Sequence, residues 1–291
     1  MNSVLSQLRR IITDGRYPHL LIIGVQKAGT TTLFDMLNHC SNFCGSYDKE
    51  TGFFIKDVFY KQGYEWYLKQ FEQCRRDAIK FEGTPAYIYH PDAAKRIFLF
   101  NKHMKFIVIL REPATRCYSA WNMFRRFNEF SPNKIFEQFT QYANPSEKEA
   151  IRNLLFTEHF PSFKQAVEDD IERYLSRSGD IEPSFVRRGI YFEQIANYLQ
   201  YFSLSDFLFL EQRELNSPVA IFKKISDFLN VAINVDSMNN PILSNVGNYL
   251  GMCAENEETF LLLKDFYRSH NEKLFSQIGI RYDWNESAWV K

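Results

Sequence analysis

The sequence predicts an α/β fold in which a central, mainly parallel sheet is flanked by helices on both faces and carries a helical insertion. Short apolar runs, which are typical of buried strands, alternate along the chain with segments of helical periodicity. That alternation is the order of elements in parallel sheets covered by helices. The chain has 291 residues, 45% of them hydrophobic, and is long enough to bury the large core that such a fold needs.

The expected elements follow one another in a simple order. The apolar runs that predict strands are residues 19–24, 79–82, 105–110 and 207–210. The segments whose apolar spacing predicts helices are residues 30–40, 91–100, 114–127, 191–202, 218–229 and 255–277. Ligands of such sheets bind at the carboxyl ends of the strands, so we expect a site in the segments that follow them.

Between about residues 125 and 188 the strand signal stops, and the sequence becomes charged, aromatic and helical. This region is either a separate helical lobe or an insertion over the sheet, and we favour the insertion. No repeat, low-complexity tract or long linker marks a boundary elsewhere. We therefore expect a single domain over residues 1–291.

The charge composition excludes one class of partner. The 35 basic and 35 acidic residues cancel, so the net charge at pH 7 is zero. Without a global positive field to gather polyanions, we expect no nucleic-acid partner. Any anion site must therefore be local.

The cysteines and the N-terminal segment bear on the cellular compartment. Five cysteines are an odd number without a Cys-x-x-Cys pair, which indicates neither a disulfide framework nor a zinc ribbon and favours a reducing compartment: Cys40, Cys44, Cys74, Cys117 and Cys253. Residues 1–24 lack the apolar stretch and cleavage site of an export signal, and no uninterrupted apolar run approaches ~18 residues. We expect a cytoplasmic protein without stable membrane insertion.

The clearest motif is GVQKAGTT at residues 24–31, between the first predicted strand and the first predicted helix. Gly24 and Gly29 keep the G-x-x-x-x-G spacing of a phosphate-binding loop, so backbone N–H groups and a helix N-terminus can point at one anion. The loop makes the predicted sheet P-loop-like. In the nucleotidase pattern a lysine follows the second glycine, whereas here Thr30 holds that place and Lys27 lies inside the loop. The alternative is a strand-to-helix turn with a solvated lysine.

A second constellation follows the strand at residues 105–110. Arg111 lies at the carboxyl end of that strand, and Ser119 lies eight residues later on the predicted helix. A guanidinium and a hydroxyl can together hold a second phosphate. A magnesium-dependent nucleotidase often carries an acidic residue at such a strand end, but here Glu112 is followed by Pro113, which favours a turn. We therefore expect no metal in the site.

Five segments, in order, resemble one known family. They are VQKAGTTTL, KETGFF at residues 49–54, EGTPAY at residues 82–87, LREPATRCYSAW, and FYRSHNEKLF at residues 266–275. Together they resemble the sulfotransferases that use 3'-phosphoadenosine 5'-phosphosulfate (PAPS), and most closely the heparan-sulfate type of carbohydrate sulfotransferase. The resemblance covers most of the chain, with only the region after Arg125 poorly matched.

The resemblance implies roles for particular residues. Lys27 matches the lysine of the family's 5'-phosphosulfate loop, and its neighbours supply backbone and hydroxyl donors: Ala28, Gly29, Thr30, Thr31 and Thr32. Arg111 and Ser119 match the pair that holds the 3'-phosphate, and Glu50 matches the catalytic base of heparan-type enzymes. The implied co-substrate is PAPS, with no metal, and the insertion at residues 125–188 is expected near the acceptor site.

The sequence departs from the family pattern in two places. Related carbohydrate enzymes often have a lysine where Gly83 stands here, so a second cationic group is missing or comes from elsewhere. A late basic glycine loop is also not evident, because residues 244–253 contain no Lys or Arg, and the usual cysteine pair is reduced to Cys253.

These residues suggest a mechanism without a divalent ion. Lys27 would stabilise the departing 5'-phosphate oxygen, and Glu50 would accept the acceptor's proton. A carboxylate is a weak base unless partly buried, and Phe53 and Phe54 are expected to supply that burial. The alternative for Glu50 is a surface carboxylate paired with Lys49.

Other polar residues have weaker claims. Among the six histidines, only His90 is an alternative base, since none has the i, i+4 partner of a metalloprotease helix. The arginine doublets could meet an anionic acceptor or form solvated helix faces: Arg125, Arg126, Arg187 and Arg188.

Three functions are compatible with these patterns. The first is a sulfotransferase acting on a hydroxyl, in preference to an amine, of a carbohydrate or another small acceptor. The second is a P-loop small-molecule kinase, against which the position of Lys27 and the presence of Arg111 argue. The third is a non-catalytic nucleotide-binding module of the same fold. The sequence indicates no oligomeric state.

Overall fold

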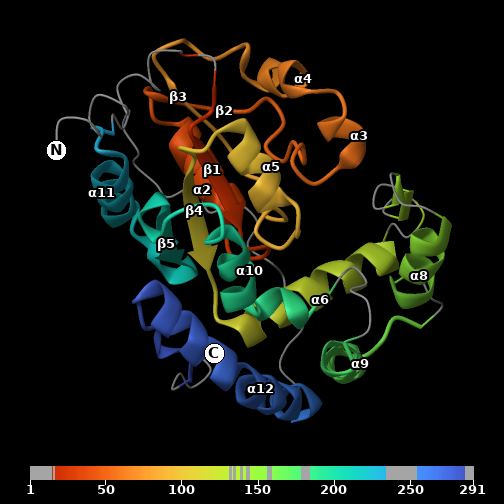
Figure 1. Cartoon of the computed structure of the whole chain (residues 1–291). Coiled ribbons are helices and arrows are strands. Elements are labelled where there is room, and N and C mark those ends of the chain that lie inside the picture. Colours follow the sequence, from red (N-terminus) through yellow and green to blue (C-terminus); the bar gives the residue numbers. More distant parts are fainter. Residues whose placement is uncertain are drawn as a thin grey trace. The chain divides into compact units, whose positions relative to one another are not determined.

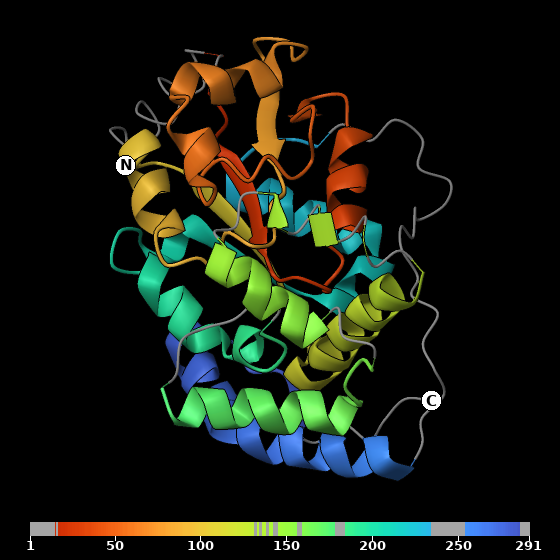
Figure 2. The same ribbon diagram turned by 90° about the vertical axis from the view of Figure 1, so that its right-hand side faces the viewer.

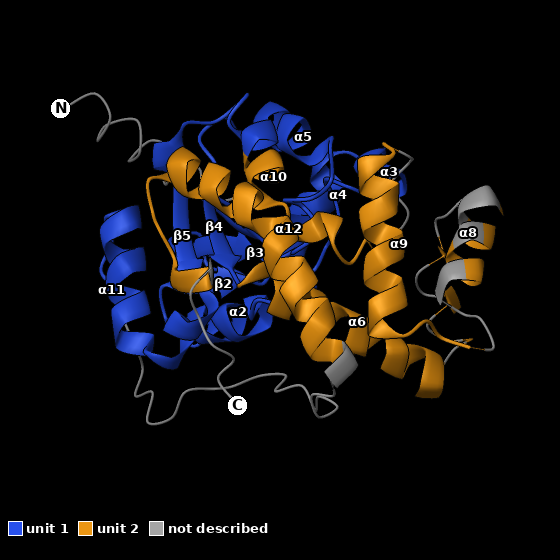
Figure 3. Cartoon of the chain, turned by 90° about the horizontal axis from the view of Figure 1, so that it is seen from below, with its two compact units in different colours: residues 1–111, 196–246 blue, residues 112–195, 247–291 orange. Residues whose placement is uncertain are grey.

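The computed structural model describes residues 15, 17–130, 133, 136–137, 140–141, 145–155, 159–177, 184–233 and 254–285 (Figure 1). The chain forms two compact units, each assembled from two separate segments (Figure 3). Unit 1 comprises Met1–Arg111 and Ala196–Val246, and unit 2 comprises Glu112–Ile195 and Gly247–Lys291.

Unit 1 is built on a five-stranded parallel sheet whose strand order is β2-β3-β1-β4-β5. The strands are β1 (Leu20–Gly24), β2 (Phe43–Gly45), β3 (Ile79–Glu82), β4 (Lys105–Leu110) and β5 (Phe207–Glu211). Because all five strands run the same way, their carboxyl ends lie together along one side of the sheet, its carboxyl edge. The loops that follow β1, β3 and β4 therefore lie next to one another at that edge.

Helices cover both faces of this sheet, which explains why β1 is buried along its whole length. Figures 2 and 3 show α2 (Thr30–Asn38) and α11 (Pro218–Leu229) on one face and α5 (Ala93–Phe100) on the other. α11 begins at a proline and ends at Asn230, whose left-handed backbone stops the helix. The predicted fold class is confirmed.

A cluster of aromatic side chains fills the space beside the sheet between residues 53 and 100. The same stretch of chain contains two short helices and a helical turn that the apolar spacing does not predict: α3 (Asp57–Tyr60), α4 (Tyr64–Leu68) and η1 (Lys69–Phe71). Phe53 and Phe54 are fully buried here, and the Phe53 ring stacks on Tyr67 at 4.7 Å between centroids. The cluster fixes the segment that carries Glu50 to the body of unit 1.

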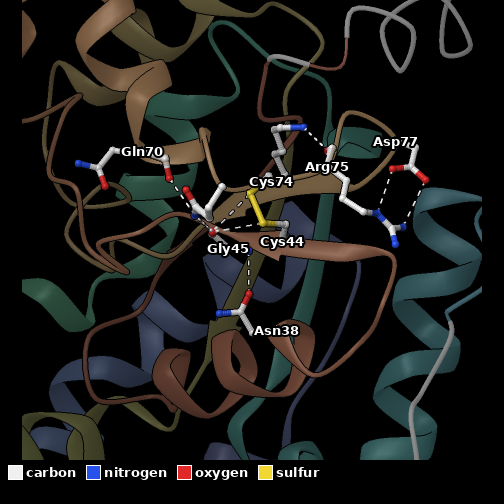
Figure 4. The surroundings of a disulfide bond; sticks show 9 residues. Asn38, Cys44, Gly45, Gln70, Cys74, Arg75 and Asp77 are labelled. Atoms are coloured by element: carbon white, nitrogen blue, oxygen red, sulfur yellow. Dashed lines mark hydrogen bonds and ion pairs between the residues drawn. A yellow bond between two sulfur atoms is a disulfide. The ribbon is translucent and has the colours of Figure 1, made fainter.

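The edge strand β2 is also missing from the prediction, and with it the one disulfide of the described residues. Cys44 in β2 and Cys74 before β3 are joined, with 5.7 Å between their Cα atoms (Figure 4). The expectation of unpaired cysteines is wrong for this pair. The two residues are 30 positions apart, and only the parallel pairing of β2 with β3 brings them together. The reducing compartment inferred from the cysteine count thus loses its basis.

Unit 2 is helical in the part that the structure describes, as expected for residues 125–188. Its main helices are α6 (Pro113–Phe130), α8 (Pro145–Leu155), α9 (Phe163–Leu175) and α12 (Ala254–Ile278), and α12 packs on α6 and α9. Ser162 and Gln165 form a reciprocal cap at the start of α9. α12 confirms the helix predicted over residues 255–277, and its Phe260 and Leu263 are buried in the core of unit 2.

The predicted elements agree closely with those observed. The ranges 79–82, 105–110 and 218–229 coincide with β3, β4 and α11, and the other predicted ends differ by up to four residues. Residues 244–253, where the basic glycine loop was sought, lie outside the described residues. In the part of the chain that the structure describes, no helix is both long and apolar enough to cross a membrane. The cytoplasmic location stays a prediction.

Candidate functional site

The loop after β1 has the backbone geometry of an anion site. Lys27 and Gly29 have positive φ angles of 72° and 91°, whereas Ala28 between them does not. Alternation of this kind turns successive N–H groups toward one point. A β-carbon at Gly29 would lie 2.4 Å from Leu215 Cδ1, so both the backbone conformation and the packing require glycine there. The motif at residues 24–31 thus forms a loop whose conformation requires the glycine at position 29.

The N-terminus of α2 continues this anion site. Gly29 is the N-cap residue, no side chain caps the helix, and the first turn contains no acidic residue. The first N–H groups of a helix have no partners within it, and the helix dipole favours negative charge at that end. Thr30 and Thr32 are buried, and Thr31 is half-buried. This end of α2 is therefore suited to a phosphate or a phosphosulfate.

Arg111 is joined to this loop by a direct hydrogen bond. It follows the last residue of β4, and its Nη1 donates to the carbonyl oxygen of Lys27 at 2.9 Å. The Val25 N–H donates to the Ile109 carbonyl at 2.8 Å and adds a second tie between the loop and β4. The structure therefore brings together two of the predicted site residues that are 84 positions apart.

Ser119 lies in α6 of unit 2, where it is buried. Its pairing with Arg111 around a 3'-phosphate stays a prediction.

Glu50 lies at the same sheet edge but differs from the expectation. Its side chain is 56% exposed and its Oε1 lies 2.8 Å from Lys49 Nζ. Phe53 and Phe54 are buried in the aromatic cluster, and so the expectation that they bury Glu50 is wrong. The observed pairing with Lys49 is the arrangement that the alternative interpretation of Glu50 described.

Lys49 connects the Glu50 segment to the loop after β3. Its Nζ donates to the carbonyl oxygen of Gly83 at 3.1 Å, and the Gly83 N–H donates to the Lys49 carbonyl at 3.0 Å. Gly83 directly follows β3, which is the sheet neighbour of β1. Neighbouring strands lie about 4.8 Å apart, so Glu50 and the anion loop belong to adjacent positions along one edge.

Glu82, the last residue of β3, lies in a buried cage of hydroxyl groups. Thr51 Oγ1 donates to its Oε2 at 2.9 Å, and Thr84 Oγ1 donates to its Oε1 at 2.7 Å. The Thr51 hydroxyl also lies 3.1 Å from that of Tyr87. Burial raises the pKa of Glu82, and the surrounding hydroxyl donors act in the opposite direction. This carboxyl group thus connects the residue after Glu50 to the strand end.

Lys56 is a further cation close to Glu50. Burial lowers the pKa of Lys56, while the negative charge of Glu50 acts to raise it. Gly52, with φ of 63°, lies beneath the lysine stem, since a β-carbon there would be 3.3 Å from Lys56 Cδ. Glu50 therefore has a lysine before it and a lysine after it in the sequence, and both interact with its charge.

The remaining candidates have structural contacts. His90 Nδ1 accepts from the Asp92 N–H at 3.2 Å at the start of α5, and its role as an alternative base stays a prediction. In unit 2, Arg125 pairs with Glu129 at 2.9 Å, and Arg187 donates to the Arg173 carbonyl at 3.2 Å. Among the described residues no group of three or more His, Cys, Asp or Glu side chains is placed to hold a metal ion.

Sheet, loop and arginine together define an α/β protein with a P-loop-like anion loop. The sulfotransferase domain model matches residues 17–246, which is most of the chain. The chain therefore belongs to the sulfotransferase domain family, and the predicted enzyme class is confirmed at that level.

Curated relatives and one solved structure agree with this assignment. Heparan sulfate glucosamine 3-O-sulfotransferase 5 of Mus musculus is 27% identical over 76% of this chain and 56% of that protein. Heparan sulfate glucosamine 3-O-sulfotransferase 6 of Homo sapiens is 29% identical over 74% of this chain and 52% of that protein. Membrane-associated sulfotransferase kil1 of Dictyostelium discoideum is 23% identical over 92% of this chain and 66% of that protein.

The chain thus spans about half to two thirds of the length of these relatives. A sulfotransferase from Alicyclobacillus acidocaldarius has a similar fold, with a TM-score of 0.66 at 19% identity, covering 93% of this chain and 99% of that one. The family model confirms the family that the motifs indicate, and heparan-sulfate sulfotransferases are among the relatives to which this chain is similar.

The sequence analysis missed the polar residues that hold the Glu50 segment in place. Glu82, Thr51 and Thr84 lie inside or beside the quoted motifs, but their contacts depend on how two loops meet. A glutamate ending an apolar strand, followed two residues later by threonine, is the one local signal that could have drawn attention to them.

Proposed function

We propose that this chain transfers a sulfuryl group from PAPS to a hydroxyl, in preference to an amine, of a carbohydrate or similar small acceptor. The observation that carries the proposal is the loop after β1. There Lys27, Gly29 and the uncapped start of α2 form an anion site to which Arg111 is hydrogen-bonded. The family assignment and the heparan-sulfate relatives support a glycan acceptor.

The residues of this loop fit the 5' end of the donor. Backbone N–H groups around Ala28 and Gly29, with the hydroxyls of Thr30, Thr31 and Thr32, would hold the phosphosulfate. Lys27 would neutralise the charge that develops on the 5'-phosphate oxygen as its bond to sulfur breaks. Arg111, with Ser119, would hold the 3'-phosphate and so orient the donor.

Glu50 is the proposed base for the acceptor. It would take the hydroxyl proton while the acceptor oxygen forms its bond to sulfur, giving the sulfated acceptor and adenosine 3',5'-bisphosphate. A sulfuryl group carries less charge than a phosphoryl group, so lysine and backbone dipoles are sufficient in this proposal and no metal is invoked.

The two units are proposed to act as one sulfotransferase domain. The family match runs without interruption through segments of both, from residue 17 to residue 246. In this proposal the helical segment at residues 125–188 is an insertion near the acceptor site.

Calorimetry and turnover test the proposal in two steps. The full chain should bind adenosine 3',5'-bisphosphate without magnesium, and more tightly than ATP with or without magnesium. Magnesium-dependent ATP binding would instead support the kinase. Incubation with labelled PAPS and a panel of glycan and small hydroxyl acceptors should then yield a sulfated product by mass spectrometry. Binding without transfer to any member of the panel would favour a non-catalytic module.

A further inference from the structure

Lys49 joins Glu50 to the loop after β3 through its ammonium group. The Lys49 ammonium lies 2.8 Å from Glu50 Oε1 and 3.1 Å from the carbonyl oxygen of Gly83. Only 18% of its side chain is exposed, although the paired carboxylate is 56% exposed. The Lys49 side chain is therefore largely buried at the carboxyl edge of the sheet, whereas the Glu50 side chain is exposed to solvent.

The backbone around Lys49 is fixed on the same two loops. The Gly83 N–H donates to the Lys49 carbonyl at 3.0 Å, the Thr51 hydroxyl donates to Glu82 at 2.9 Å, and the Gly52 N–H donates to Thr84 Oγ1 at 3.4 Å. These three ties flank Glu50 on both sides in sequence. The Lys49 side chain contacts the Glu50 carboxylate directly.

The glycine at position 83 is not required by space or by backbone conformation. A β-carbon there would make only ordinary contacts, with Phe34 Cδ2 at 3.4 Å as the nearest atom, and Gly83 does not have a positive φ. A side chain at position 83 would start toward Phe34 and Ile22, which are buried, and no atom of Lys49 is among its nearest neighbours. The contact that holds the Lys49 ammonium is with the backbone carbonyl oxygen of Gly83 and does not depend on a side chain at that position.

Stability alone gives little reason for this ion pair. A pair with one exposed partner contributes at most about 1 kcal/mol to folding. A carboxylate that acts as a general base, in contrast, depends on being held at hydrogen-bond distance from the proton it removes. The arrangement is therefore better explained by the orientation of Glu50 than by stabilisation of the loop.

We propose that Lys49 is a positioning residue, which holds the Glu50 carboxylate in place from the same segment. The inference rests on the proposed sulfuryl transfer. In that reaction the proton moves from the acceptor hydroxyl to Glu50, and Lys49 keeps its own proton throughout.

Substitutions that remove or keep the charge test this role. Lys49→Met should lower kcat for transfer from PAPS by about tenfold or more, a part of the 100-fold or larger contribution of a positioned general base. Affinity for adenosine 3',5'-bisphosphate should change by less than about twofold, because Lys49 contacts Glu50 and Gly83 and not the anion loop. Lys49→Arg, which keeps the cation, should keep kcat to within about threefold of the parent.

Two controls separate an effect through Glu50 from general effects. Glu50→Gln removes the carboxylate, and adding Lys49→Met to it should lower kcat no further. Lys102→Met removes an exposed lysine ahead of β4, at the opposite edge of the sheet, and should behave as the parent.

The outcomes are distinguishable. A parent that transfers sulfuryl groups together with a Lys49→Met variant of equal kcat would overturn the inference alone. An equal loss of kcat on adding Lys49→Met to Glu50→Gln would also overturn it, since Lys49 would then act independently of Glu50. A parent that neither binds the bisphosphate nor transfers would overturn the proposed function and this inference together.

Discussion

Two neighbouring loops at the carboxyl edge of the sheet are built in different ways. The loop after β1, residues 25–29, takes its shape from its own backbone, through the positive φ angles of Lys27 and Gly29. The Glu50 segment, residues 49–54, takes its shape from side chains of a distant stretch, chiefly Glu82 and Thr84. The shape of a loop set by its own backbone can be predicted from a motif, whereas the contacts of a segment held by distant side chains cannot.

The largest expected effect on the rate of transfer comes from Lys27, in the loop after β1. Lys27→Ala should lower the rate of transfer by about 100-fold or more, the scale observed when a donor to a developing oxyanion is removed. Alanine keeps a β-carbon at the same positive φ, so the backbone strain of the loop is unchanged. Single-turnover measurement with labelled PAPS checks this, and Lys27→Arg, which keeps a cation, should lose less. A rate close to the parent's would remove Lys27 from the mechanism.

The next effect concerns the contact that joins the local loop to β4. Arg111→Lys keeps the charge but loses the paired N–H donors, one of which binds the Lys27 carbonyl. Hydrogen bonds to charged groups contribute about 1.5–3 kcal/mol, so affinity for adenosine 3',5'-bisphosphate should fall roughly tenfold or more. Calorimetry measures this directly. Unchanged affinity would mean that Arg111 only supports the loop.

A smaller effect is expected from the cage that holds the second loop. Because burial raises the pKa of Glu82 above its ordinary value of 4.5, the folded chain holds this proton more tightly than the unfolded chain. The stability that protonated Glu82 contributes is therefore complete below the unfolded pKa and is lost as pH rises through the folded pKa.

Glu82→Gln removes that titration while keeping a side chain of the same shape. The free energy of unfolding of the parent, relative to that of the variant, should fall as pH rises above about 4.5. Urea denaturation of both proteins over a range of pH measures the difference. A parent that gains stability relative to the variant over this range would show that Glu82 is ionised more readily in the fold.

The parts of the fold that could be predicted from the sequence are those whose structure is set locally, and the parts that depend on tertiary contacts could not. Apolar runs such as residues 105–110 bury on both faces of a parallel sheet, so their periodicity identifies strands directly. β2 was missed because a three-residue edge strand, with Cys44 half-buried at its centre, has no such run. The Cys44–Cys74 disulfide was missed for the same reason, since it depends on where β2 pairs.

The candidate site divides in the same way. Lys27, Gly29 and Arg111 could be predicted because the order of strand, glycine loop and helix fixes their positions. The identity of Glu50 could be inferred from its motif, but not its exposure or its contact with Lys49, which also contacts Gly83 in another loop.

The most direct measurement is a crystal structure of the full chain with adenosine 3',5'-bisphosphate. The account predicts the 5'-phosphate on the backbone N–H groups of Gly29 and Thr30, with Lys27 Nζ within hydrogen-bond distance and Arg111 on the 3'-phosphate. A nucleotide bound away from the loop after β1, or a 5'-phosphate there with the Lys27 ammonium turned away, would contradict it.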